Sequence, residues 1–426
     1  MATKVGINGF GRIGRQVLKA ITERYPGKLE VVAINDLVAT DVNANLLKYD
    51  SNYGRWNKEI RAESDGLVVD GRVIKVFAER DPGAIPWGSV GVDIVIESTG
   101  LFTDATKAVA HKRDSVKKVV ISAPAKNEDF TIVLGVNGEK YNPATHNVIS
   151  NASCTTNGLA PVVKVIVDNL GMQKGQMTTI HSYTNSQQIL DKAAGTDLRE
   201  MRAGGLNIVP TSTGAARALR LVIPEVDGIL DGLAYRVPTP TVSIVEIVAL
   251  TKKDTTRDEL NTLLRDTSTG QMKGILGFTM DPVVSMDMKG DERSSIVDGQ
   301  STNVVGGNLV KVAAWYDNEW GYACRISDLC SFLVDKGLLR FGFEDGVEAV
   351  TEPSSHLELL HFGRPGKGTK RDRRFLDVAP RRDVRLFEQR HHVGMGVRHV
   401  AAGECERDAF HAMDLLQHLR HRLAYR

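Results

Sequence analysis

A single thiol stands among small, hydrogen-bonding residues in the segment Ser150–Asn157. The apolar segment that follows predicts a helix, and Pro161 is tolerated there only if it lies near the first turn. Cys154 would then lie at or just before a helix N-terminus, where unpaired backbone N–H groups and the helix dipole favour an anion. A thiol so placed is expected to ionise more easily, and the thiolate is the nucleophile. A lone cysteine is more often inert and buried, but the polar flanks of Cys154 favour catalysis.

A cysteine that attacks a carbonyl group needs a base or a cation nearby. Three histidines precede residue 340, namely His111, His146 and His181. We expect His111, in a charged stretch, to be solvated at the surface, and His146 to lie in a turn. His181 ends an apolar strand and begins a long polar segment that runs to Pro210, so its position makes it the candidate base. A histidine at the end of a strand is about as often only structural.

A glycine-rich turn near the N-terminus has the spacing of a dinucleotide-binding site. The segment Gly9-Phe10-Gly11-Arg12-Ile13-Gly14 fits G-x-G-x-x-G and lies between a strand and a helix. A second strand ends at Asp36, 22 residues after Gly14, where an acid can accept hydrogen bonds from ribose hydroxyls. Leu37 and Val38 follow, so no neighbouring cation is offered to a 2′-phosphate. The pattern therefore favours NAD over NADP.

The elements around these motifs predict an α/β fold with a second domain. Strands alternate with helices over residues 1–150, which indicates a doubly wound parallel sheet of the Rossmann type. Residues 151–318 mix long strands with fewer helices and are typical of an α+β catalytic domain. Further strands are expected at 72–78, 92–97, 117–122 and 131–136, a short helix with a threonine cap at 103–110, and a helix from about Ala323 to Lys336.

Residues 339–426 differ from the rest of the chain. They hold eight of the eleven histidines and several basic clusters, but little sustained periodicity. We expect a disordered or loosely folded C-terminal extension. Its histidines and Cys405 lack strict metal-ligand spacing, so we expect no metal site.

Composition narrows the class of protein. A length of 426 residues favours two domains, and no apolar run is long enough for a membrane span. The start of the chain enters a strand pattern at once, so we expect no signal peptide. Four cysteines do not make a disulfide framework, which indicates a cytoplasmic protein. The nearly balanced charge gives no reason to expect nucleic acid or a membrane as a partner.

Taken together, these motifs resemble those of the glyceraldehyde-3-phosphate dehydrogenases, over about residues 4–338. The resemblance implies an NAD-dependent homotetramer in which Cys154 is the nucleophile and His181, in Thr179-Ile180-His181, is the general base. It implies that helix 319–338 completes the NAD-binding domain. It implies NAD contacts at Gly9, Gly11, Arg12, Ile13, Gly14, Asp36, Arg80, Ser122 and Asn318, and Asn318 would hold the nicotinamide carboxamide. Inorganic phosphate would bind at Ser153, Thr155, Thr213 and Gly214. The phosphate of the substrate would bind at Thr184 and Arg236.

The implied reaction is the oxidation of D-glyceraldehyde 3-phosphate through a hemithioacetal and a thioester on Cys154, which inorganic phosphate cleaves. Two departures from the family pattern stand out. Position 158 is Gly, where the family often has a second cysteine, and the segment Asp191–Arg199 differs from the usual loop and is slightly longer. The alternatives are an erythrose-4-phosphate dehydrogenase, or a non-catalytic binding protein that retains the fold.

Overall fold

The computed structural model describes residues 1–64 and 66–338. The prediction of a disordered extension over 339–426 falls on residues outside this range, as does the prediction that the histidines of that extension hold no metal.

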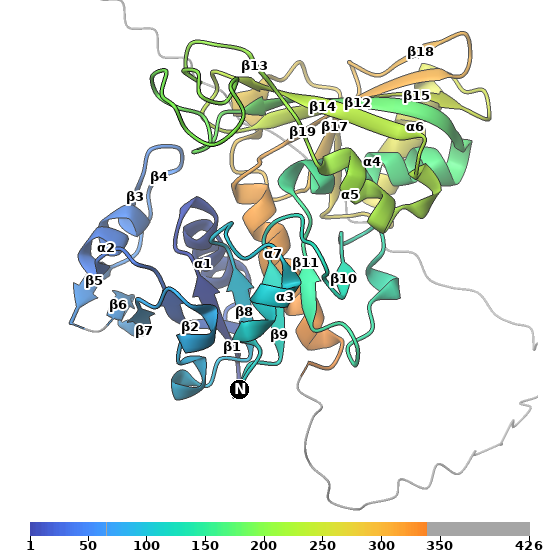
Figure 1. Ribbon diagram of the computed structural model, residues 1–426. Helices are drawn as coiled ribbons and strands as arrows, with labels where there is room; N and C mark the ends of the chain where they lie inside the picture. Colours follow the sequence, from blue (N-terminus) through green and yellow to red (C-terminus); the bar gives the residue numbers. More distant parts are fainter. Residues whose placement is uncertain (65, 339–426) are drawn as a thin grey trace, which may run out of the picture. The chain divides into compact units, whose positions relative to one another are not determined.

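A nine-stranded sheet forms the first part of the chain (Figure 1). Its strands run in the order β10-β11-β9-β8-β1-β2-β7-β6-β5, and they are parallel from β10 to β7. Such parallel strands need crossover connections, which the helices provide. The prediction of a doubly wound parallel sheet is therefore confirmed. The strands are β1 (Thr3–Asn8), β2 (Leu29–Asn35), β5 (Ile60–Glu63), β6 (Gly66–Val69), β7 (Arg72–Phe77), β8 (Ile94–Glu97), β9 (Lys118–Ile121), β10 (Phe130–Thr131) and β11 (Val148–Ser150).

Apolar side chains cover both faces of this sheet. Val5 and Ile7 of β1 point to one face, where they join a core with helix α1 (Arg12–Arg24) and helix α7 (Trp320–Asp335). Residues from β2 and β8 pack on the other face against the short helix α3 (Ala105–Ala108). Because α7 comes from the end of the described chain, a segment far away in sequence contributes to the core on this face of the sheet. Helix α2 (Thr40–Lys48) and the two-stranded sheet of β3 (Tyr49–Asp50) and β4 (Gly54–Arg55) extend beside it.

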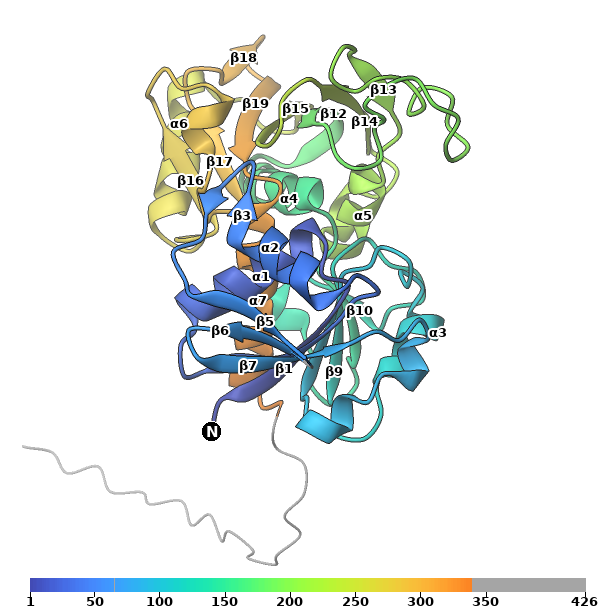
Figure 2. The same ribbon diagram turned by 90° about the vertical axis from the view of Figure 1, so that its left-hand side faces the viewer.

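An eight-stranded mixed sheet forms the second part (Figures 1 and 2). One of its faces is covered by helices α4 (Cys154–Leu170), α5 (Ala215–Val222) and α6 (Arg257–Thr269), whose apolar side chains share one core with it. Alternate residues of β15 are buried, as expected for a strand with one covered face. The strands are β12 (Met172–Ser182), β13 (Val209–Thr211), β14 (Leu230–Val237), β15 (Ser243–Thr251), β16 (Leu276–Thr279), β17 (Ser295–Asp298), β18 (Asn303–Val305) and β19 (Leu309–Tyr316).

Two expected helices differ from the observed ones. Helix α4 begins at Cys154, so Pro161 lies inside the helix and not in its first turn. Proline removes one backbone donor there, and burial of the helix face in the core compensates for that loss. Helix α3 is shorter than expected, and its cap is Asp104, whose carboxylate accepts from the Thr106 N–H (3.0 Å).

Two further boundaries also differ from the expectation. Strand β10 ends at Thr131, because the side chain of Asn137 takes over the backbone groups that would continue the strand. Asn137 donates to the Thr131 carbonyl and accepts from the Val133 N–H, each at 2.9 Å. Helix α7 begins at Trp320, earlier than expected, since the carboxylate of Asp317 accepts from its backbone N–H (2.9 Å).

His111 is buried, and the prediction of a solvated surface histidine is wrong. The side chain is 0% exposed. Trp87 Nε1 donates to Nδ1 of His111 (3.1 Å), and Nε2 lies 3.0 Å from a carboxylate oxygen of Glu97. Because indole is only a donor, Nδ1 must accept and Nε2 must carry the hydrogen that Glu97 accepts. The charged sequence around His111 concealed this partnership, which forms between segments distant in the chain.

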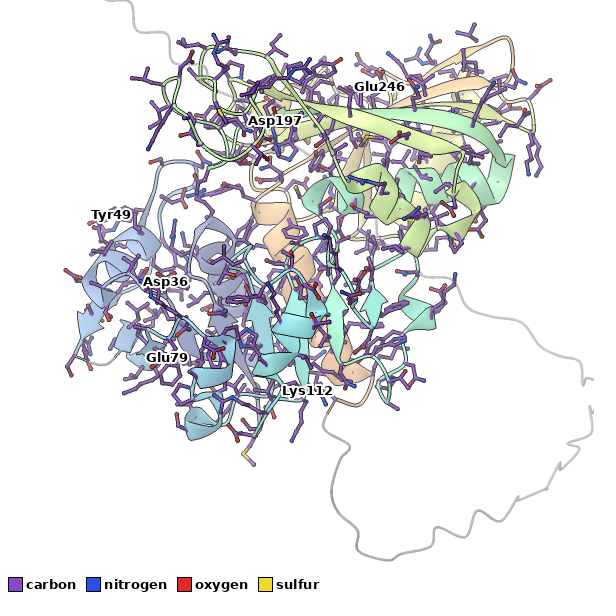
Figure 3. The ribbon with its side chains drawn as sticks, viewed as in Figure 1. Asp36, Tyr49, Glu79, Lys112, Asp197 and Glu246 are labelled. Carbon is purple, nitrogen blue, oxygen red and sulfur yellow. The ribbon has the colours of Figure 1, made fainter. Side chains whose placement is uncertain are left out.

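We expect His111→Ala to lower the free energy of unfolding by about 3–5 kcal/mol, because it removes a buried ring and leaves the buried Trp87 Nε1 without its acceptor. Urea denaturation measures the change. The neighbouring Lys112 is exposed (Figure 3), and Lys112→Ala, as the matched control, should change stability by less than about 0.5 kcal/mol. Equal effects of the two substitutions would contradict the buried placement.

Candidate active site

The nucleophile and base candidates are brought together by two different elements. Helix α4 starts at Cys154, while strand β12 ends one residue after His181. Cys154 Sγ lies 3.5 Å from His181 Nε2. Strands β12 and β14 are parallel neighbours, and their register places Arg236 directly beside His181. A thiol, an imidazole and a guanidinium therefore meet at one point.

Cys154 occupies the helix N-terminus that the sequence predicts. Ser153 is the N-cap, and its hydroxyl accepts from the Thr156 N–H (3.0 Å). The Cys154 side chain is half-buried and packs against both apolar cores. Burial raises the pKa of the thiol, whereas the charge of Arg236 and hydrogen bonds from Thr155 act to lower it. The expectation of an easily ionised thiol is thus wrong for this structure, because desolvation outweighs the helix terminus.

His181 has the properties of a neutral base. Burial, and secondly the charge of Arg236, lower the pKa of His181 to about 3. Its Nδ1 lies 2.7 Å from the Ser182 carbonyl, an acceptor, and 2.5 Å from Arg236 Nη1, a donor. These two contacts require different tautomers. Only the tautomer with hydrogen on Nδ1, bonded to Ser182, leaves the lone pair of Nε2 facing Cys154.

Donors suited to an anion lie beside this pair, at Arg236 and Thr155, and at Thr213 near the start of α5. The Nε of Arg236 is buried and has no hydrogen-bond partner among the described residues, and a buried donor of this kind calls for an acceptor. Thr155 Oγ1 contacts the Tyr316 hydroxyl (2.9 Å). Thr213 Oγ1 accepts from the Ala215 N–H (3.1 Å) at the start of α5.

The remaining phosphate candidates are less enclosed. Thr184 follows β12 by two residues, and its hydroxyl contacts Ser186 Oγ (3.1 Å). Gly214 is the N-cap of α5. Neither Thr184 nor Gly214 forms a hydrogen bond with Cys154.

A cavity of about 360 Å³ lies at the carboxyl ends of β1, β2 and β8. Of the predicted cofactor residues, Gly9, Gly11, Asp36 and Arg80 line it. Figure 3 labels Asp36 together with Glu79, which lines the same cavity. A Cβ atom on Gly11 would meet nothing within 4 Å, so the space above this residue is open to a ligand. These features fit the pyrophosphate and ribose of a dinucleotide.

Gly14 and Arg12 serve this turn in different ways. A Cβ on Gly14 would lie 2.2 Å from the Gly9 carbonyl oxygen, so only glycine lets helix α1 approach the strand. Arg12 is the first residue of α1, and its side chain is held by Asp50 (2.6 Å) and Glu319. Arg12 can therefore offer a ligand its backbone N–H, as can Ile13 next to it.

Besides Arg12, Ile13 and Gly14, the predicted cofactor residues Ser122 and Asn318 lie outside this cavity lining. Ser122 follows β9, and its N–H donates to the Glu97 carbonyl (2.9 Å). Asn318 lies between β19 and α7 and is buried, with its side-chain oxygen held by two serines. Ser182, Ser243 and Tyr316 are polar, buried neighbours of the site that sequence reasoning missed. Of these three residues, only Ser182 could have been found from the sequence, because it follows His181 directly.

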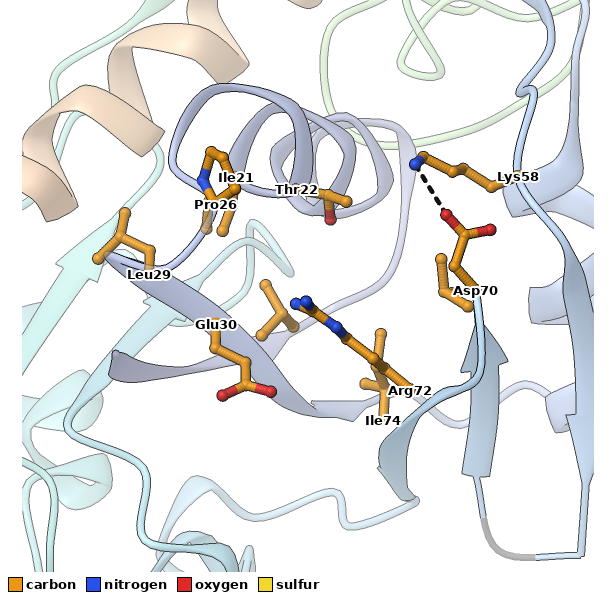
Figure 4. A pocket seen from close by; sticks show the side chains of 11 residues that line it. Ile21, Thr22, Pro26, Leu29, Glu30, Lys58, Asp70, Arg72 and Ile74 are labelled. Carbon is orange, nitrogen blue, oxygen red and sulfur yellow. Dashed lines mark ion pairs between the residues drawn. The ribbon is translucent and has the colours of Figure 1, made fainter. Parts of the chain in front are cut away.

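A second hollow lies away from Cys154, between α1 and the strands β2 and β7 (Figure 4). Its walls are largely aliphatic, and Lys58 forms an ion pair with Asp70 at its rim (2.7 Å). It contains no cysteine or histidine, so we assign no reaction to it.

Within residues 1–64 and 66–338, no helix is long and apolar enough to cross a membrane. Among the same residues, no group of His, Cys, Asp and Glu side chains is arranged to hold a metal ion.

The fold and the cofactor cavity are those of a dinucleotide-dependent dehydrogenase. Residues 3–105 match the family model "Glyceraldehyde 3-phosphate dehydrogenase, NAD binding domain", and residues 153–318 match "Glyceraldehyde 3-phosphate dehydrogenase, C-terminal domain". The chain belongs to the glyceraldehyde-3-phosphate dehydrogenase family. It is an NAD-dependent oxidoreductase, and the family's reaction is the glycolytic oxidative phosphorylation of D-glyceraldehyde 3-phosphate to 1,3-bisphosphoglycerate.

Bacterial enzymes are among the similar proteins. Glyceraldehyde-3-phosphate dehydrogenases of Priestia megaterium (strain DSM 319 / IMG 1521) and Geobacillus stearothermophilus are each 53% identical over 338 residues. Glyceraldehyde-3-phosphate dehydrogenase 1 of Bacillus subtilis (strain 168) is 52% identical over the same length. Each alignment covers 100% of the relative but 79% of this chain. The extension predicted from the sequence thus has no counterpart in these three proteins.

Proposed function

We propose that Cys154 is the nucleophile and His181 the general base of this reaction. The observation that carries the proposal is the 3.5 Å contact between Cys154 Sγ and His181 Nε2 at the start of α4. A neutral imidazole beside a thiol can take its proton as the sulfur attacks. Burial and the charge of Arg236 lower the pKa of His181 to about 3, so the ring is neutral at physiological pH and the lone pair of Nε2 is unoccupied.

The chemistry then proceeds on the sulfur of Cys154. The sulfur attacks the aldehyde carbon, and the thiol proton ends on the new hydroxyl of the hemithioacetal. His181 removes that hydroxyl proton as the carbon loses a hydride, which leaves a thioester. Bound NAD supplies the acceptor for the hydride. An oxygen of inorganic phosphate then attacks the thioester carbon, the sulfur leaves as thiolate, and His181 returns its proton to that thiolate.

Two groups of donors would hold the two phosphates. We assign the phosphate of the substrate to Thr184 and Arg236, since the unpartnered Nε of Arg236 provides a buried cationic donor. We assign inorganic phosphate to Ser153, Thr155, Thr213 and Gly214, which are hydroxyl and backbone donors at the starts of α4 and α5.

Residues of the first domain would hold NAD. Gly9, Gly11, Arg12, Ile13 and Gly14 would surround the pyrophosphate at the start of α1, and Asp36 and Arg80 would contact the adenosine. Ser122 and Asn318 would lie toward the nicotinamide. The domain boundaries that follow are 1–150 with 319–338 for NAD binding, and 151–318 for catalysis.

We expect NAD to exceed NADP in kcat/KM, and Asp36→Asn to reduce that preference by about tenfold. The carboxylate of Asp36 accepts from the Phe10 N–H (2.7 Å) and the Val38 N–H (2.9 Å), and its negative charge would repel a 2′-phosphate. A tenfold change in the NAD-to-NADP preference corresponds to a free-energy difference of about 1.4 kcal/mol, which is in the range of one such charge interaction. Asp81→Asn, at an exposed turn, is the control for a lost surface charge. Equal efficiencies with NAD and NADP in the unaltered enzyme would refute this assignment.

We further propose a homotetramer in the cytoplasm. The segment between β12 and β13 exposes a set of large apolar side chains, which we call the apolar loop face: Ile189, Leu190, Leu198, Leu206 and Ile208, with Ile189 91% exposed. Figure 3 marks this loop by Asp197. Exposed apolar patches of this kind mark interaction surfaces, and a second copy is the commonest partner. Free thiols at Cys154, Cys324 and Cys330 suit a reducing compartment.

One assay tests the proposed function. NADH formation from D-glyceraldehyde 3-phosphate is followed with and without inorganic phosphate, and erythrose 4-phosphate is the comparison aldehyde. We expect turnover that requires phosphate and prefers the three-carbon aldehyde. A preference for erythrose 4-phosphate would favour the alternative dehydrogenase, and no turnover of either aldehyde would favour a non-catalytic protein. Light scattering after size exclusion tests the tetramer, which a monomer mass would refute.

A further inference from the structure

The side-chain amide of Asn318 is held on one side only. Its Oδ1 lies 2.9 Å from Ser182 Oγ and 3.0 Å from Ser243 Oγ. Its Nδ2 forms no hydrogen bond with the described residues. This nitrogen is also not a fully enclosed atom. The amide therefore has an occupied oxygen side and a free nitrogen side.

The hydrogen bonds of Ser182 and Ser243 fix the orientation of the Asn318 amide. Both serines are buried. The Oγ of Ser243 already accepts from the Ser182 N–H (3.0 Å), so its own hydrogen is available to donate. The Ser182 hydroxyl contacts Asn318 and no other described side chain or backbone group. Because buried hydroxyl hydrogens need acceptors, both donate to Oδ1 of Asn318.

A flipped amide would break this arrangement. The NH₂ group would then face two hydroxyls, and neither hydroxyl hydrogen would have an acceptor. A buried donor left without a partner is unfavourable by about 1–3 kcal/mol. The two serines thus favour the orientation in which Asn318 presents Nδ2, a pure donor, to the free side.

Three chain segments converge to place these groups. Ser182 ends β12 and Ser243 begins β15, its antiparallel neighbour. The residue before Ser243 is Val242, which is buried and has φ +65°. A β-branched residue in this left-handed region is strained by roughly 1–3 kcal/mol and persists only where its surroundings fix it. The strain lies where the chain must turn to bring Ser243 against Asn318.

We propose that Ser182 and Ser243 are positioning residues that lock the amide of Asn318, so that the nicotinamide site offers a hydrogen-bond donor to the carbonyl oxygen of the cofactor's carboxamide. This inference rests on the proposed role of Asn318 in cofactor binding. It adds that the direction of the bond is set by the two hydroxyls. Ser182 also contacts His181 Nδ1 through its carbonyl (2.7 Å), so one residue orients both the base and the amide.

The experiment compares NAD with its 3-acetylpyridine analogue, in which a methyl group replaces the carboxamide NH₂. The analogue keeps the carbonyl acceptor but lacks the donor. Dissociation constants of both oxidised dinucleotides are measured by calorimetry. In the Ser182→Ala/Ser243→Ala variant, the freed amide can bond NAD in either orientation, through its nitrogen to the carbonyl or through its oxygen to the NH₂, whereas only the first bond is possible with the analogue. We expect the ratio of the analogue Kd to the NAD Kd to rise by up to about twofold over the unaltered enzyme, because only one of the two amide orientations can bind the analogue.

Two further variants make the outcome decisive. Ser295→Ala is the matched control, since Ser295 is a buried serine whose hydroxyl has no partner, and it should leave the ratio unchanged. Asn318→Asp, which can only accept, should raise the ratio at least as much as the double variant. A purely structural effect of the serines would weaken both dinucleotides equally and leave the ratio unchanged, which would overturn the proposal.

The same variants separate two kinds of failure. If Asn318→Asp changes the ratio and the double serine variant does not, the locking of the amide is refuted while the role of Asn318 stands. If Asn318→Asp also leaves the ratio unchanged, Asn318 does not contact the carboxamide, and the proposed cofactor assignment fails with it.

Discussion

Replacing Cys154 by alanine should lower kcat by about four to six orders of magnitude, the loss typical of a removed nucleophile. Both covalent intermediates form on this sulfur, and His181 is the only other proposed participant in bond breaking. The cofactor cavity lies at the ends of β1, β2 and β8 and does not include Cys154, so the Kd for NAD should stay within a few-fold. The measurement is kcat in the phosphate-dependent assay together with NAD binding by calorimetry.

Cys324→Ala is the matched control for this prediction. Cys324 is a fully buried thiol in α7, and burial raises its pKa to about 12. We expect Cys324→Ala to retain kcat. Iodoacetamide should label Cys154 before Cys324 and Cys330, because Cys154 alone of these three is accessible. Retained activity in Cys154→Ala, or earlier labelling of a buried thiol with loss of activity, would contradict the assignment.

Replacing His181 by glutamine should lower kcat by about 10²–10⁴, the contribution typical of a general base. Glutamine has a similar reach but cannot take a proton from the thiol or from the hemithioacetal hydroxyl. His146→Gln is the control, since His146 lies in a turn and stacks on Phe130 at 4.6 Å between ring centroids. The base assignment would fail if the two substitutions lowered kcat equally.

His181 should also make stability depend on pH, in a direction that its pKa fixes. The folded protein holds the pKa near 3, whereas an unfolded histidine titrates near 6.5. Between these values the unfolded chain binds the extra proton. The stabilisation that depends on a neutral His181 is therefore complete above about pH 6.5. It is lost as the pH falls toward 3, and the free energy of unfolding decreases by up to about 1.4 kcal/mol per pH unit.

Urea unfolding at several pH values between 5 and 8 tests this contribution. The unaltered enzyme should lose more stability than His181→Gln as the pH falls below about 6.5, and the two should change in parallel above it. Parallel curves over the whole range would show that His181 is not held neutral by burial.

Several features were predictable from the sequence because their physical causes are local. The apolar segment that follows Cys154 was sufficient to place this residue at a helix start, where α4 begins. The alternation of strands and helices predicted the parallel sheet, since each strand and helix is defined by its own pattern of apolar residues. The need for glycine at Gly14 follows from one close approach to Gly9, within the same turn.

Other predictions failed because they depended on partners far away in the chain. Pro161 could lie inside α4 only because the core around that helix is extensive. The charged neighbours of His111 suggested a surface position, but Trp87 and Glu97 enclose it from other segments. The pKa of Cys154 is raised because two apolar cores meet at its side chain. The residues around it in the segment Ser150–Asn157 do not predict that burial.

The sequence by itself determined which groups could react: a thiol at a helix start, a histidine at a strand end, and a glycine turn with an acid after the next strand. These follow from backbone geometry over short spans. Only the tertiary structure decided their protonation and orientation. The pairing of β12 with β14 and β15, and the start of α7, bring Arg236, Ser182, Ser243 and Asn318 together from positions up to 136 residues apart. Burial and hydrogen-bond direction are properties of that assembly, because they depend on what surrounds each group and not on its neighbours in the chain.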